Sequence, residues 1–458
     1  MKHFETHSVG AAQTGFIGSV QKALGCLSAA LLLGGTALAE EPWTLNRALE
    51  QALAHNPDAR LAQQRIVAAQ AGLEQANAAF WPRVQFQSSY TRTDNPMMVF
   101  GSILNQRAYS SSLDFNNVPD VDDLNVRGLV TMPLYAGGRN KAMQKSASAS
   151  AQAARSDDEA VRNALEFEVA RAFFTVIKTR EFIQAAEASV NSYETNVALA
   201  KRRLENGALL KTEALDLDVR LAQAREDLVR AQNANALSRR ALRNLLGIEE
   251  GAFDVAESAP SPAPPDSEDF SHRAELAAAR QRERAAEEQA RAAKAGYLPR
   301  LSAFGSLDYD HGWKFDHNGQ SYTAGGLLQW DVWDGKLTRA KTREAQANLE
   351  SAREEQRKVR LALDLEVEQA RLELKSATER LAVSQTAVSQ ASESASLTRA
   401  RFEQGAALST QLIDAETALV GARVRRAEAE ADQRIALAAL RKAVGLPQLD
   451  SKERTESK

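Results

Sequence analysis

Four short segments of the chain alternate between apolar and polar residues. A period of two predicts a β-strand with one apolar face, because successive side chains point to opposite sides of a sheet. The pattern therefore predicts two hairpins, at about 83–135 and about 300–333, with loops at about 94–123 and 310–320. The apolar positions are Val84, Phe86 and Tyr90; Val126, Gly128, Val130, Met132 and Leu134; Leu301, Ala303, Leu307 and Tyr309; and Tyr322, Ala324, Leu328, Trp330 and Val332.

The segments that follow the hairpins have a helical composition. Glycine and proline are absent from residues 139–206, where alanine, glutamate, glutamine, lysine and arginine dominate. At ~1.5 Å per residue, such a helix would be roughly 100 Å long. Gly207 is expected to end this helix and Gly405 its counterpart, each as a left-handed cap. The chain then reverses into second helices that reach about Gly247 and Gly445.

The chain contains an internal duplication. VRNALEFEV begins at Val161 and VRLALDLEV begins at Val359, 198 positions later. The same shift pairs identical residues in Arg203 and Arg401, Glu205 and Glu403, Gly207 and Gly405, Ala208 and Ala406, Thr212 and Thr410, and Asp216 and Asp414. Upstream, AAFWPRV matches AGYLPRL at a larger shift, so the first copy carries extra residues within its hairpin, as expected for a surface loop.

These boundaries predict five segments. Residues 40–251 form the first repeat and residues 272–447 the second, each with an initial helix, a hairpin and long helices. The proline-rich stretch at 252–271 is the linker between them, and the charged tail at 448–458 is expected to be disordered.

Residues 1–39 have the features of an export signal. A polar leader ends at Lys22, ALGCLSAALLLGG is a short apolar run, and Ala37-Leu38-Ala39 predicts cleavage after Ala39. A transmembrane anchor would need a longer apolar run. Cys26 is the only cysteine and precedes most of the apolar run, so lipidation is not expected. The mature chain would then have no cysteine for a disulfide, thiol catalysis or a metal site.

The rest of the sequence favours a membrane protein that spans with strands. The formal net charge is −3, and no basic cluster points to nucleic acid. No later segment suits a membrane-spanning helix. One end of the hairpins carries an aromatic girdle typical of membrane strands, although a soluble hairpin also alternates. Its members are Phe80, Trp81, Tyr135, Tyr297, Trp330 and Trp333.

The number of strands decides how such a sheet could enter lipid. Two hairpins supply four strands, whereas the smallest membrane barrels have about eight. An open sheet edge in hydrocarbon would leave backbone groups without hydrogen bonds, at a cost of several kcal/mol each. The barrel must therefore be shared between chains.

At this point the sequence resembles the TolC family of outer-membrane efflux proteins over nearly the whole mature chain. The resemblance rests on NPDARLAQQRIVAAQAGLEQANAAFWP, PLYAGGR, two RxExGAxxxT turns and LRKAVGLP, in this order and duplicated. It implies an α+β membrane protein in which three chains build a 12-stranded outer-membrane β-barrel that continues into a long periplasmic α-helical barrel. It also implies a homotrimer without cofactors that takes substrates from an inner-membrane pump and a periplasmic adaptor to the exterior.

The resemblance assigns candidate residues to the periplasmic entrance. Asp414, nine residues after the tip glycine, matches a ring of carboxylates that narrows the entrance; three such charges near a threefold axis attract cations. Asp216 is its copy. Gln411 stands where the family often has a second acid, and Glu213 is a candidate for the missing charge. Ala407 stands where the family also has arginine, so a salt-bridge latch is not implied.

The two helix tips are the candidate adaptor contacts. They comprise Gly207 and Ala208 in the first repeat and Gly405 and Ala406 in the second. A plain helix cap would need the same glycines, so both roles can hold together.

Other chemistry finds little support in the sequence. No phosphate-binding glycine loop, nucleophile elbow or zinc motif occurs, so no enzymatic activity is expected. A cluster in the second hairpin follows no metal-ligand spacing and is interpreted as a polar outer loop. It comprises Asp308, Asp310, His311, Asp316 and His317. Two alternatives to efflux stay open: a conduit for type I protein secretion, and a periplasmic coiled-coil scaffold or adaptor without a pore.

Overall fold

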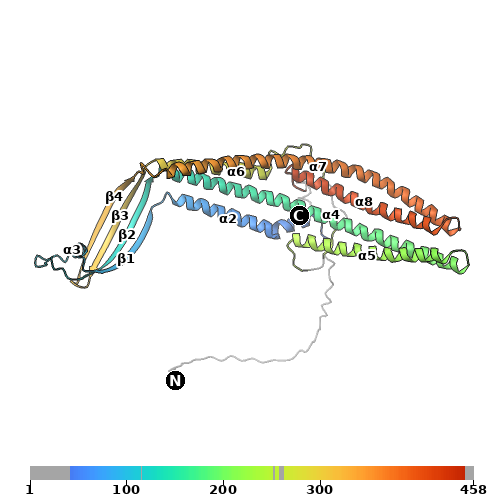
Figure 1. The fold of residues 1–458 in the computed structure, drawn as a ribbon, viewed down its shortest axis with the longest axis horizontal. Helices are drawn as coiled ribbons and strands as arrows, with labels where there is room; N and C mark the ends of the chain where they lie inside the picture. Colours follow the sequence, from blue (N-terminus) through green and yellow to red (C-terminus); the bar gives the residue numbers. More distant parts are fainter. Residues whose placement is uncertain (1–41, 115, 251–252, 257–261, 449–458) are drawn as a thin grey trace, which may run out of the picture. The chain divides into compact units, whose positions relative to one another are not determined.

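The computed structural model describes residues 42–114, 116–250, 253–256 and 262–448 (Figure 1). The expected signal peptide, its cleavage site after Ala39, Cys26 and most of the expected tail lie outside these residues. The elements are α1 (Leu45–His55), α2 (Pro57–Ala78), β1 (Arg83–Thr93), α3 (Pro96–Asn105), β2 (Val121–Tyr135), α4 (Arg139–Glu205), α5 (Lys211–Leu245), α6 (Ala274–Lys294), a short 3₁₀ turn (Ala295–Tyr297), β3 (Arg300–Gly312), β4 (His317–Gln329), α7 (Leu337–Glu403) and α8 (Ser409–Ala443).

The four strands form one antiparallel sheet in the order β1-β2-β3-β4. Its register pairs Phe86 with Gly128, Gly128 with Leu307, and Leu307 with Tyr322. Paired residues in a ladder share a face, so the predicted apolar positions within the regular ladder lie on one face. Leu134 falls at the register shift before Tyr135, and Trp330 and Val332 follow the end of β4 at Gln329. The opposite face carries mainly polar side chains, including Gln87 and Arg127. The prediction of four alternating strands is confirmed.

Both hairpin loops differ from the sequence prediction. Between β1 and β2 the chain forms helix α3, where a loop was expected. Asn95 caps this helix, its side chain accepting hydrogen bonds from the backbone of Met97 and Met98, and Pro96 occupies the first turn, where its missing N–H costs nothing. The second loop is a short turn, because β3 runs to Gly312 and β4 starts at His317. The expected loop at 310–320 was therefore too long.

The long helices are present and equal in the two repeats. Helices α4 and α7 each contain 67 residues, and α5 and α8 each contain 35. Both bounds of each pair differ by the 198 positions seen in the sequence. Proline occupies the first position of α2, as predicted. None of the helices in the described part of the chain is long and apolar enough to cross a membrane.

Helix α4 is the centre of the helical packing. It contacts α1, α2, α5, α6 and α8, whereas α7 packs mainly against α6 and α8. The largest apolar cluster surrounds Phe173 and Val169 of α4, which meet Leu49 of α1 and Leu242 of α5. Phe173 is fully buried, which contributes about 1.5–3 kcal/mol relative to an exposed side chain.

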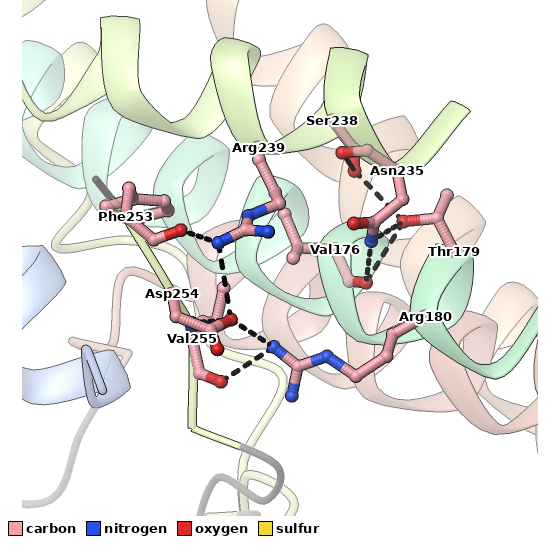
Figure 2. A network of polar contacts seen from close by, with 9 residues as sticks. All are labelled: Val176, Thr179, Arg180, Asn235, Ser238, Arg239, Phe253, Asp254 and Val255. Carbon is pink, nitrogen blue, oxygen red and sulfur yellow. Dashed lines mark hydrogen bonds and ion pairs between the residues drawn. The ribbon is translucent and has the colours of Figure 1, made fainter. Parts of the chain in front are cut away.

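Polar contacts fix the chain where it leaves α5 (Figure 2). Arg180 of α4 donates hydrogen bonds to the Asp254 carboxylate at 2.7 Å and the Val255 carbonyl at 2.8 Å. Arg239 of α5 pairs with the same carboxylate. Val255 in turn forms an isolated parallel bridge with Trp43. The start of the first repeat is thereby joined to the linker that follows it.

Candidate functional site

The two helix hairpins end in turns of the same construction. In the first, the Gly207 N–H donates to the Leu204 carbonyl at 3.0 Å and the Ala208 N–H to the Arg203 carbonyl at 2.8 Å. This pair of bonds is the Schellman motif, which needs a left-handed residue, and Gly207 has φ +71°. Gly405 repeats the motif with φ +80°. The expected left-handed caps are confirmed.

The structure brings the two tips together. Arg203 donates from Nη1 to the Phe402 carbonyl at 2.7 Å and lies over the Phe402 ring, 5.0 Å from its centroid. An apolar cluster behind the turns contains Phe402 together with Tyr193 and Leu217. The Tyr193 hydroxyl lies 3.3 Å from the Thr417 hydroxyl, and burial raises the pKa of this tyrosine.

A charged contact one step further from the turns links three helices. The guanidinium of Arg399 on α7 pairs with the carboxylate of Glu416 on α8 and donates to the Ser192 hydroxyl on α4 at 3.0 Å. Glu416 is almost fully buried, whereas Arg399 is about one-third exposed. Because a buried carboxylate is costly without a partner, the ion pair holds α7 against α8, and the hydrogen bond to Ser192 joins this hairpin to α4.

The four candidate entrance residues divide into two kinds. Asp414 and Asp216 are exposed, and neither forms an ion pair with any residue that the structure describes. Glu213 and Gln411 instead cap their own helices, accepting hydrogen bonds from the backbone N–H groups of Leu210 and Leu408 at 3.2 Å. This is the reciprocal half of a capping box. The Glu213 carboxylate also lies 3.5 Å from the Ser409 hydroxyl of the other tip.

The tips expose apolar as well as small residues. Gly207, Ala208, Gly405 and Ala406 are exposed. Leu210 and Leu408, at the start of the returning helices, are 67% and 60% exposed. These leucines were not singled out from the sequence, although their equivalent places in the two RxExGAxxxT turns could have identified them.

The residues of the expected aromatic girdle lie at the helix-side end of the sheet. Trp81 precedes β1 and Tyr135 ends β2, while Tyr297 precedes β3 and Trp330 follows β4. All of the girdle residues are well exposed in the single chain. The Trp330 indole donates to the Tyr297 carbonyl at 3.1 Å, which ties the two ends of the second hairpin.

The polar cluster of the second hairpin lies partly in a strand. Asp308 and Asp310 belong to β3, are buried, and bind Arg127 and Asn125 of β2. The expectation of an outer loop was wrong for these two residues and for His311, because β3 extends to Gly312, and for His317, which begins β4. Within the described residues, no group of three histidine, aspartate or glutamate side chains is arranged to hold a metal ion.

Comparisons with known proteins agree with this architecture. The chain is similar to the VceC outer membrane protein of Vibrio cholerae, with 19% identity, 88% of this chain and 97% of that chain covered, and a TM-score of 0.76. It is similar to CusC at 18% identity, with 88% and 92% covered and a TM-score of 0.78. It is also similar to the MtrE outer membrane channel of Neisseria gonorrhoeae, with 17% identity, 88% of this chain and 89% of that chain covered, and a TM-score of 0.72. At these identities the likeness concerns the fold.

The family comparison covers both repeats. The model of the family described as outer membrane efflux protein matches residues 48–248 and 268–446, which span most of the chain. A search of curated proteins finds no match. The two matched segments each contain one hairpin of strands and one pair of long helices. The chain belongs to the outer membrane efflux protein family.

Proposed function

We propose that three copies of this chain form a passive channel of a tripartite efflux system in the outer membrane. The channel would lead from an inner-membrane pump and a periplasmic adaptor to the exterior. Family membership supports the outer-membrane efflux role. CusC and MtrE, described as transmembrane and outer membrane channels, are related in fold.

The observation that carries the proposal is the four-stranded sheet, apolar on one face and unpaired at both edges. β1 and β4 are the edges, and the strands alternate in direction. A β4 edge can therefore accept the β1 edge of a neighbouring copy and continue the antiparallel order around a ring. In lipid this closure is required, because unpaired edge groups cost several kcal/mol each. Two copies would give eight strands, whose interior is filled by side chains; three give twelve and leave a lumen.

The helices supply independent support for several copies. Equivalent positions of α4 and α7 differ sharply in burial. Phe174 is 4% exposed and Ala185 is 6% exposed, whereas their copies Leu372 and Val383 are 51% and 70% exposed. The equivalent surface of α4 is covered within the chain by α8. A neighbouring chain would cover α7 in the same way.

The returning helices show the complementary difference. Ile413 of α8 is 4% exposed, whereas its copy Leu215 of α5 is 52% exposed. Val229 of α5 is likewise exposed, although its copy Ala427 is buried. The exposed apolar face of α7 and the exposed apolar face of α5 would pack against each other across a subunit boundary. The ring would then contain six nearly equivalent helix pairs, two from each chain.

The entrance and the adaptor contact are assigned to the tips of these pairs. The exposed glycine turns and the two exposed leucines offer an adaptor a small apolar surface. Asp414 is the proposed entrance carboxylate, since it is exposed on α8 close to the tip and free of ion pairs with described residues. Its copy Asp216 on α5 is the weaker candidate.

Single-channel recording in a planar bilayer tests the conduit and its entrance together. The purified protein should give stable, cation-preferring steps. Replacing Asp414 by alanine should lower the cation preference and alter the step size, because the variant removes one carboxylate per chain from the entrance. Asp216→Ala is the matched control, with an exposed carboxylate at the equivalent place, and should change selectivity less.

The outcomes separate the parts of the proposal. Unchanged steps in Asp414→Ala would keep the channel and remove Asp414 from its entrance. An absence of steps from inserted trimers, after the tip contacts have been loosened by Arg399→Ala, would contradict the conduit and favour a scaffold without a pore.

A further inference from the structure

Helix α3 packs against the sheet and lies on its polar face. A Cβ atom placed on Gly312 would come 2.1 Å from Oε1 of Gln106, and one placed on Gly319 would come 1.8 Å from the Asn105 carbonyl oxygen. Both glycines pair in the ladder on the polar face, Gly312 with His317 and Gly319 with Asp310. The end of α3 therefore rests directly on that face of the second hairpin.

Side chains hold the helix at this place. Val99 and Ile103 are fully buried against Val121, which is the first residue of β2. The buried Gln106 donates from Nε2 to the Asp122 carbonyl at 2.8 Å and to the Asp123 carboxylate at 2.9 Å. These contacts leave α3 seated at the loop end of the strands, away from the long helices (Figure 1).

The remaining surface of α3 is apolar and exposed. Met97, Met98, Phe100 and Leu104 are 78%, 51%, 38% and 46% exposed. A short helix that packs two apolar residues on the sheet would ordinarily present polar residues to water. Here the outer side is as apolar as the inner one, which marks a surface for packing.

We infer that the α3 helices of three chains pack against one another across the channel axis and form an apolar constriction at the outer mouth. The inference rests on the proposed trimeric barrel. In such a barrel the apolar face meets lipid and the polar face lines the lumen. Since α3 lies on the polar face, its free side points inward, toward the same helix of the other copies.

The dimensions agree with contact between the three helices. Twelve strands spaced about 4.8 Å apart and tilted by about 40° enclose a backbone diameter of roughly 24 Å. An α-helix with its side chains is about 10 Å across, so three of them side by side need roughly 22 Å. The helices would therefore nearly fill the mouth, and an apolar ring of this kind excludes water and ions until it opens.

Cysteine cross-linking in the purified trimer tests this contact. The mature chain is expected to contain no cysteine, because the single Cys26 lies in the predicted signal peptide; Met97→Cys, Met98→Cys and Phe100→Cys are therefore introduced one at a time and oxidised. At least one of them should give disulfide-linked dimers on a non-reducing gel. Phe86→Cys is the matched control: Phe86 is 77% exposed, close to the value for Met97, but it lies on the apolar face. Its copies would sit outside the barrel and stay unlinked.

A polar substitution gives a second measurement. Met97→Asp should raise single-channel conductance at least twofold, because a ring of carboxylates keeps the constriction hydrated and open to ions. Trimers, verified by mass, in which none of the three cysteines cross-links more than the Phe86→Cys control would overturn the inference and leave the proposed channel standing. An absence of trimers would overturn the proposed channel and the inference with it.

Discussion

Helices α4 and α7 have the same length and occupy equivalent positions in the two repeats, yet α4 is largely buried within the chain and α7 is largely exposed. Twenty residues of α4 are buried, compared with seven of α7. Their surroundings differ because α4 lies between α5, α6 and α8 within the chain, whereas α7 has neighbours on one side only. In the proposed trimer, the duplication would therefore provide each interface twice, once inside the chain and once between neighbouring copies.

The largest effect, on assembly of the proposed trimer, is expected from a charge placed on the exposed face of α7. Phe174 of α4 lines a cavity with Ala427 of α8, so its copy Leu372 should pack near Val229 of the neighbouring chain. Leu372→Asp would bury an unpaired carboxylate there, at a cost of about 3–5 kcal/mol per interface. The trimer should dissociate to monomers, as measured by the mass of the detergent-solubilised protein.

A second substitution makes the test specific for that pairing. Val229→Lys places a cation where the proposed neighbour would present it, so the double variant with Leu372→Asp should recover the trimer. Recovery requires the two positions to meet across chains, because α5 and α7 are not packed against each other within the described part of the chain. If Leu372→Asp alone leaves the mass of the assembly unchanged, the proposed equivalence of the two interfaces is wrong.

The two repeats also differ in the side chain that donates a hydrogen bond to the last carbonyls of their returning helices, α5 and α8. Asn56 precedes α2 and donates from Nδ2 to the Leu245 carbonyl at the end of α5, at 2.9 Å. Arg273 precedes α6 and donates to the Ala443 carbonyl at the end of α8, at 2.8 Å. Leu245 and Ala443 are equivalent residues. Arg273 is only 2% exposed and additionally pairs with the Glu275 and Glu366 carboxylates.

This difference predicts unequal losses of stability. Arg273→Met should lower the free energy of unfolding by about 3–5 kcal/mol, because the Glu275 carboxylate and the Lys442 and Ala443 carbonyls lose their buried donor. Glu366 keeps an ion pair with Lys442. Asn56→Ala removes a neutral cap and should cost about 1 kcal/mol. Arg284→Met, on an exposed part of α6, is the control and should stay within about 0.5 kcal/mol. Denaturant titration at fixed protein concentration measures all three, and similar losses for Arg273→Met and Arg284→Met would contradict the structural role.

The same contact gives a pH dependence of defined sign. Burial alone would raise the pKa of Glu275, but hydrogen bonds from Arg273 and from its own backbone outweigh burial and lower it below the ordinary value of 4.5. A carboxylate with a lowered folded-state pKa stabilises the protein above its unfolded pKa and loses that contribution as the pH falls through the folded value. Arg273→Met should therefore show less acid destabilisation below pH 4.5 than the unaltered protein.

The sequence predicted elements with strong periodicity and missed those held by local capping and distant contacts. The four strands and the long helices followed from alternation and from the absence of glycine and proline. Helix α3 was overlooked because Asn95, Pro96 and the surrounding serines and asparagines suggest a loop. The same Asn-Pro pair is a helix start when apolar residues follow, as Met97 and Val99 do.

The candidate site was predicted in outline only. The tip glycines could be found because the left-handed turn demands that residue type. The contacts between the tips could not, since Arg203 and Phe402, or Arg399 and Ser192, are joined by the packing of two helix hairpins that are distant in the chain. No spacing rule connects them. Glu213 and Gln411 were considered as entrance residues, but their side chains also cap helices, a role that their position three residues after the cap would have indicated.

The smallest predicted effect concerns the two tip arginines, which are equivalent in sequence and unequal in contact. Arg203 donates to the Phe402 carbonyl of the other tip, whereas among the described residues Arg401 donates only to the Ala406 carbonyl of its own turn, at 3.4 Å. Arg203→Met should destabilise the joined tips by about 1 kcal/mol, a value reduced by the exposure of the contact. Amide hydrogen exchange around the second turn should accelerate about fivefold, and Arg401→Met should change it little. Equal acceleration by both variants would mean that Arg401 also contacts a neighbouring chain in the assembled ring. The difference between the contacts of Arg203 and Arg401 would then exist only in the isolated chain.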